Sequence, residues 1–104
     1  MRKSETETIY INRATYDGTT IYLNSILEFA PKLTDDKQHV TIEDKMLGIN
    51  VIAESRKGIL NELNYIIYII WKEYVESDEN MVPKAMELKE IWKSLIKTVE
   101  ILGG

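Results

Sequence analysis

Four glutamates form the group of side chains whose spacing best suits a metal ion. Glu73 and Glu76 precede a polar turn, and Glu87 and Glu90 follow it. Carboxylates three residues apart lie on one face of a helix, and Mg²⁺ prefers oxygen ligands of this kind. However, Glu87 and Glu90 flank the apolar stripe of their predicted helix from opposite sides, so the four carboxylates should not converge. We therefore expect neither a metal site nor a bound cofactor.

The remaining reactive side chains lack the partners that catalysis needs. His39 is the only histidine, and the chain has no cysteine, so it can form neither a Cys–His pair nor a thiolate metal site. The five glycines are scattered or terminal and form no phosphate-binding loop. The serines lie in no nucleophile-elbow context. We expect no catalytic residues and interpret the chain as a non-enzymatic protein.

Length and charge narrow the class of protein further. A chain of 104 residues with ordinary apolar and charged fractions is expected to fold as a single domain, 1–104. A net charge of −4 disfavours a dedicated nucleic-acid binder, which needs clustered lysines and arginines. Lys89, Lys93 and Lys97 recur every four residues, but Glu90 and Glu100 lie among them. We interpret this set as a solvated helix face.

The start of the chain and its lack of cysteine predict the compartment. The basic Met-Arg-Lys start has no apolar segment behind it, so we expect no signal peptide. The uninterrupted apolar run 65–71 is shorter than the roughly 18 residues that a membrane-spanning helix needs. A chain without cysteine suits a reducing environment. We predict a cytoplasmic protein that does not enter a membrane.

The apolar run is instead expected in the core. A seam of apolar side chains recurs three and four positions apart, at Leu60, Leu63, Ile67, Ile70 and Tyr74. The large side chains at 65, 68 and 69 lie off this seam, so a second face must be covered by a sheet or by another subunit. We predict a helix over about 50–77 with two buried faces.

A second helix is predicted in the last quarter of the chain. Apolar residues keep a strict 4-3 spacing there, at Met81, Ala85, Leu88, Trp92, Leu95, Val99 and Leu102. Pro83 suits the first turn of a helix, and the terminal glycines suit its end. We predict a helix over about 82–102. The short loop before it predicts an antiparallel helical hairpin.

The N-terminal part of the chain predicts β-structure. Asp17-Gly18 between two β-rich segments is the strongest short hairpin signal. A two-residue turn there pairs Tyr16 with Thr19, Ala14 with Ile21, and Asn12 with Leu23. In this register, the side chains expected to face the core are Tyr10, Ala14, Tyr16, Ile21 and Leu23. We predict a hairpin or small antiparallel sheet over about 8–30, after a frayed segment 1–7.

The middle of the chain is the least defined. Residues 31–38 form a predicted polar loop after Pro31, and 38–43 is a candidate third strand. Between 41 and 53 the apolar spacing fits a helix and a strand equally well, and we favour a break near Gly48–Asn50. The predicted class is α+β, with an N-terminal hairpin or small sheet followed by a C-terminal helical hairpin.

The surplus of apolar helix faces predicts self-association. We expect a homodimer or larger oligomer built through the helical hairpin, and a partner protein that this small regulator, immunity protein or phage-type inhibitor would bind. Aromatic residues are enriched at such interfaces. The candidate interface residues are Tyr22, Tyr65, Tyr68, Ile69 and Trp71.

Two other functions stay open at this point. A pocket at the subunit interface could sequester a small ligand or nucleotide, with Arg13, Arg56 or Lys57 binding its anionic group. Alternatively, Asn12 and Arg13 on an exposed strand could contact DNA as part of a weak DNA-binding regulator. The acidic composition disfavours this last alternative.

Overall fold

The computed structural model of the chain describes residues 3–77 and 79–102 and confirms the mixed α+β class. Its two α-helices are α1 (Arg56–Ile70), which continues into a π-helical turn (Trp71–Val75), and α2 (Pro83–Leu95). A short 3-10 helix, Lys3–Thr6, precedes the first strand. The strands are β1 (Ile9–Tyr16), β2 (Thr19–Phe29), β3 (Lys32–Leu33), β4 (Val40–Asp44), β5 (Ile49–Ala53) and β6 (Ile96–Ile101).

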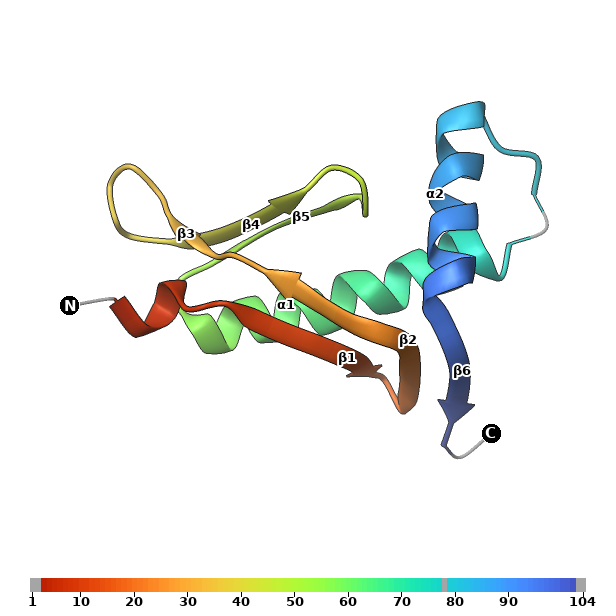
Figure 1. Cartoon of the computed structure of the whole chain (residues 1–104), viewed down its shortest axis with the longest axis horizontal. Coiled ribbons are helices and arrows are strands. Elements are labelled where there is room, and N and C mark those ends of the chain that lie inside the picture. Colours follow the sequence, from red (N-terminus) through yellow and green to blue (C-terminus); the bar gives the residue numbers. More distant parts are fainter. Residues whose placement is uncertain (1–2, 78, 103–104) are drawn as a thin grey trace.

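The six strands form two antiparallel sheets rather than one hairpin with an added strand (Figure 1). One sheet has the order β1-β2-β6, and the other has the order β3-β4-β5. Ala30-Pro31 separates β2 from β3, so the chain passes from the first sheet to the second there. Because proline has no N–H to donate, it suits this interruption of the ladder.

The predicted hairpin turn is confirmed. Tyr16 pairs with Thr19 and Ala14 pairs with Ile21 in the observed register. Asp17 and Gly18 have φ angles of 50° and 72°. A two-residue turn with both central residues at positive φ matches the right-handed twist of the flanking strands.

The predicted pairing of Asn12 with Leu23 is wrong. The register shifts between Ile11 and Arg13, so the strands bulge at this point. A bulge reverses which side chains face the core, because strand side chains alternate with a period of two. Ile9 and Ile11 are therefore buried, whereas Tyr10, which we expected in the core, is 64% exposed.

The ambiguous middle segment forms two strands. The predicted third strand exists as β4, and 49–53 forms β5 instead of the start of the long helix. Gly48, with a φ of +70°, ends the turn between them. Helix α1 begins only after Ser55, whose side chain accepts a hydrogen bond from the Gly58 N–H at 3.2 Å. This N-cap sets the helix start six residues later than predicted.

Helix α1 lies in the core of the molecule. Ile59, Leu63 and Ile67 are completely buried, and Ile70 is 4% exposed. The helix packs on β1 of one sheet and on β4 and β5 of the other (Figure 1). Each such side chain stabilises the fold by about 1.5–3 kcal/mol through burial. The second buried face that the sequence requires is thus covered by sheet within one chain.

The predicted C-terminal helix is wrong beyond Leu95. Residues 96–101 form β6, which pairs with β2, although Val99 continues the 4-3 spacing. Four of these six residues are β-branched, which favours a strand where a sheet edge is available. The helices also do not pack side by side as a hairpin. Helix α2 stands at a steep angle to α1 beside the C-terminal end of that helix, and it contacts the π-helical turn, β2 and β6 (Figure 1).

Candidate interaction surfaces

Three of the five predicted interface residues lie together in an aromatic row. Tyr16 at the end of β1 contacts Tyr65 and Tyr68 of α1, with ring centroids 5.0 and 5.1 Å apart. Trp71 extends this group of rings, with its ring centroid 6.1 Å from that of Tyr68. Lys72 places its Nζ 5.7 Å from the centroid of the Tyr68 ring, a cation–π contact. We call Tyr16, Tyr65, Tyr68 and Trp71 the aromatic row.

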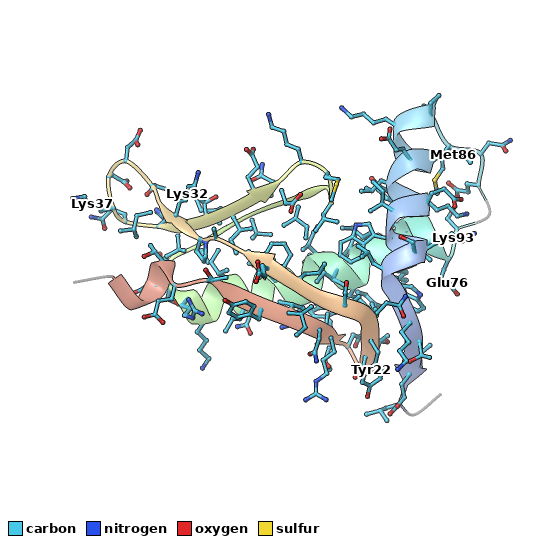
Figure 2. All side chains as sticks on the ribbon, viewed as in Figure 1. Tyr22, Lys32, Lys37, Glu76, Met86 and Lys93 are labelled. Carbon is cyan, nitrogen blue, oxygen red and sulfur yellow. The ribbon has the colours of Figure 1, made fainter. Side chains whose placement is uncertain are left out.

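The other two predicted interface residues lie elsewhere. Tyr22 pairs directly with Arg13, and both belong to the sheet face opposite the one that buries Ile21. Figure 2 shows Tyr22 at the turn end of this ribbon. Ile69 is half-buried on α1. The aromatic row thus lies on the face of the hairpin that packs against α1. Tyr22 lies on the opposite face of the sheet and cannot contact the row.

The predicted anion-binding residues are dispersed. The Arg56 guanidinium donates to the carbonyl oxygens of Glu7 and Thr8, at 2.7 and 3.2 Å, and so ties the chain before β1 to α1. Arg13 is exposed and lies five residues after Thr8, which corresponds to roughly 17 Å along a strand. Lys57 is exposed in the first turn of α1. These positions suit structural and solvated roles.

The four glutamates do not assemble. Within residues 3–77 and 79–102, no three histidine, aspartate or glutamate side chains come together as a metal-binding group. Glu90 pairs instead with Lys93 at 4.0 Å on the exposed side of α2, and Lys89 donates to the Ser77 carbonyl oxygen at 2.7 Å. The three lysines that we interpreted as one solvated helix face are also divided between two elements, because Lys97 belongs to β6.

A different surface, which could not be located from the sequence, lies beside α2. Two recesses of about 180 and 470 Å³ adjoin there and share Met46 and Ile91 in their walls. We call them together the α2 groove. Its lining residues come from the second half of β2, the end of β4, the β4–β5 turn and α2: Ile26, Leu27, Glu28, Asp44, Lys45, Met46, Leu47, Gly48, Lys84, Glu87, Leu88, Ile91, Ser94 and Leu95.

Hydrogen bonds fix the walls of the α2 groove to one another. Trp92, completely buried, donates its indole N–H to the Leu47 carbonyl oxygen at 2.9 Å and so ties α2 to the β4–β5 turn. Asn24 donates to the Ser94 carbonyl oxygen at 2.9 Å, which ties the same helix to β2. The groove is therefore formed by three elements that are bonded to each other, and it does not depend on a single loop.

Close packing at Gly48 also holds the β4–β5 turn against α2. A Cβ atom built there would lie 3.0 Å from a methyl carbon of Leu88, and the φ of +70° also disfavours a side chain. The Asp44 carboxylate accepts the Leu47 N–H at 3.1 Å and braces the same turn. The turn can thus approach α2 closely enough to leave a narrow apolar groove.

Large apolar side chains remain exposed around this groove. Met46 is 67% exposed and Ile26 is 62% exposed, although both could have been polar without cost to the core. Half-buried Leu88, Ile91 and Leu95 continue the apolar surface along α2. Contiguous exposed apolar surface on a small protein is typical of a binding site. Sequence reasoning found the stripe of α2 but could not place the β4–β5 turn against it.

The comparisons with known proteins add no relative. No family model, no curated protein and no solved structure matches this chain. In the part of the chain that the structure describes, no helix is long and apolar enough to cross a membrane.

Proposed function

We propose that this chain is a non-enzymatic interaction protein of the cytoplasm, which self-associates and acts by binding a partner protein in the α2 groove. The observation that carries the proposal is the pair of exposed apolar side chains, Met46 and Ile26, that flank a groove with an ordered frame. A preorganised apolar surface loses little conformational entropy when a partner binds.

The charges around the groove define the kind of segment that would fit. Lys45 and Lys84 lie at one recess, together with Glu87, whereas Glu28 and Asp44 line the other. A partner segment with apolar side chains in its middle, an acidic group at the lysine end and a basic group at the Glu28 end would be complementary. Complementary charge of this kind favours one orientation of binding.

Site-specific photo-crosslinking in the native cell tests the proposal. A photoreactive amino acid replaces Met46 in the groove, and in a matched variant it replaces Ile52, which is 56% exposed on β5 outside the groove. We expect a discrete crosslinked protein from position 46 and not from position 52. The protein identified in this way is then purified for binding measurements with the unmodified chain.

Two charge substitutions give the quantitative control. We expect Met46→Asp to weaken binding of the purified partner by about tenfold or more, because the complex would bury an unpaired carboxylate. Ile52→Asp introduces the same charge at similar exposure and should leave binding within about twofold. Equal crosslinking from positions 46 and 52, or unchanged binding by Met46→Asp, would show that the groove is not the partner surface.

A further inference from the structure

The two outer strands of the β1-β2-β6 sheet differ in what lies beside them. At β1, the Thr15 N–H donates to the Asn64 side-chain oxygen of α1 at 2.9 Å, and α1 packs along the strand. At β6, by contrast, no strand pairs on the side away from β2 within residues 3–77 and 79–102. Figure 1 shows β6 at the margin of the molecule. An uncovered strand edge is a template for pairing with another strand.

The observed hydrogen bonds identify which groups of β6 face outward. The Leu102 N–H donates to the Gly18 carbonyl oxygen at 2.8 Å, next to the pair Thr19–Ile101. In an antiparallel ladder, the N–H and C=O of alternate residues point to the same neighbouring strand. The backbone N–H and C=O groups of Thr98 and Glu100 therefore also point toward β2. The N–H and C=O groups of Val99 and Ile101 point to the free edge.

We propose that two copies of this chain pair antiparallel through their β6 edges, with the two-fold axis at Val99. Each Val99 would exchange two backbone hydrogen bonds with its copy. Thr98 of each chain would lie opposite Glu100 of the other on the exposed sheet face, where a hydroxyl can donate to a carboxylate. The inference rests on the proposed function, because self-association is part of it.

Other registers of the same pairing are disfavoured. Shifting the axis to Glu100 would set two glutamates directly opposite each other, which is destabilising. Shifting it to Thr98 would bring Leu102 of one copy beside Ser94 of the other, and Ser94 lies in the last turn of α2. A helical backbone cannot continue a strand ladder. Of these three registers, the Val99 register is the one that avoids both conflicts.

The pairing would also stop at two chains. Joining two β6 edges leaves β1 of each copy as the outer strand of a continuous six-stranded sheet. Helix α1 already packs along β1, and the Asn64 side chain holds the outward Thr15 N–H. The interface is isologous and closed, so it gives a dimer and not a filament.

Single cysteines test the register directly, because the chain has none of its own. Opposed residues in a hydrogen-bonded antiparallel pair have Cα atoms about 5.5 Å apart, within the range of a disulfide. We expect Val99→Cys to form a covalent dimer under mild oxidation. In the matched control, Ile101→Cys, the two thiols would lie about 13 Å apart along the strand axis and should crosslink poorly.

Light scattering tests the dimer without a covalent bond. We expect the unmodified chain to show twice its mass of 12.1 kDa, and Val99→Pro to show the monomer mass. Proline removes the outward N–H of Val99 but no N–H that bonds to β2, so the fold should persist by circular dichroism. If Val99→Pro does not fold, the crosslinking comparison still decides the question.

Two results would overturn the β6 dimer. One is a monomer mass for the unmodified chain at every concentration, and the other is equal crosslinking from Val99→Cys and Ile101→Cys. The groove is tested separately, because Met46→Asp should weaken partner binding while the dimer mass stays unchanged. Failure of partner binding with an intact dimer would contradict the groove alone.

Discussion

Helices α1 and α2 both carry an apolar stripe, but only one of the stripes is covered. Ile59, Leu63 and Ile67 of α1 are completely buried between the two sheets, and Trp92 is the one residue of α2 with comparable burial. The rest of the α2 stripe borders a groove, and in the described part of the chain no strand pairs with the outer edge of β6, which follows α2. We therefore propose a division of roles: the part built around α1, with β1, β4 and β5, stabilises the fold (the α1 half), while α2 and β6 bind partners (the α2 half).

The largest expected effect is in the α1 half. Ile67→Asp would bury a carboxylate without a partner at a completely buried position, and we expect it to lower the free energy of unfolding by about 4 kcal/mol or more. Chemical denaturation followed by circular dichroism measures this loss. Ile52→Asp, at a mostly exposed position, should change stability by only about 0.5 kcal/mol. A wild-type melting curve for Ile67→Asp would mean that this face is not buried.

A smaller loss is expected where α2 is anchored. Trp92→Phe removes the N–H that the buried Leu47 carbonyl oxygen accepts and leaves space in the core, so we expect a loss of about 2 kcal/mol. Trp71→Phe is the matched control and should cost less, because Trp71 is only half-buried. Similar losses for the two variants would show that the Trp92 hydrogen bond does not hold the groove in place.

The sequence predicted the α1 half better than the α2 half. The Asp17-Gly18 turn and the buried seam of α1 depend on local chemistry and on periodicity, which a sequence displays. The bulge near Asn12 cannot be predicted in this way, because neither β1 nor β2 contains a glycine or proline that would mark where the register shifts. The end of α2 was missed because Val99 fits a helical repeat, and the competing β2 edge is visible only in three dimensions.

The candidate surfaces show the same division. Tyr65, Tyr68 and Trp71 could be grouped from their spacing on one helix, but strand alternation places Tyr22 on the other side of a sheet. The groove joins Met46 to Ile91, which are 45 residues apart in the sequence. In the sequence, only the width of the apolar stripe of α2 indicated that this helix needs an additional contact surface.

The smallest expected effect concerns the loop 34–39, which lies at the end of the molecule away from α2 (Figure 2). The Thr34 hydroxyl donates to the Asp36 carboxylate at 2.6 Å and the Gln38 N–H donates at 3.0 Å, and together they hold the pKa of Asp36 below its ordinary value of 3.8. Because the pKa is lower in the folded state, the stabilisation is complete above the ordinary pKa and is lost as the pH falls through the folded value.

Amide exchange of Gln38 as a function of pH measures this local effect. After correction for the intrinsic pH dependence of exchange, we expect protection to fall in strongly acidic solution while the dimer mass stays the same. Asp36→Asn should remove the pH dependence, since it cannot titrate. If the oligomeric state changed over the same pH range as the protection of Gln38, the loop 34–39 and the dimer interface would not be independent, contrary to our account.

Hydrogen exchange at the two sheet edges tests the contrast most directly. The Thr15 N–H is held by Asn64 within one chain, so its protection should not depend on protein concentration. The Val99 N–H points to the free edge, so we expect slow exchange at high concentration and fast exchange on dilution. Fast exchange of Val99 at every concentration would contradict a partner strand at β6, and with it the assignment of the α2 half to self-association.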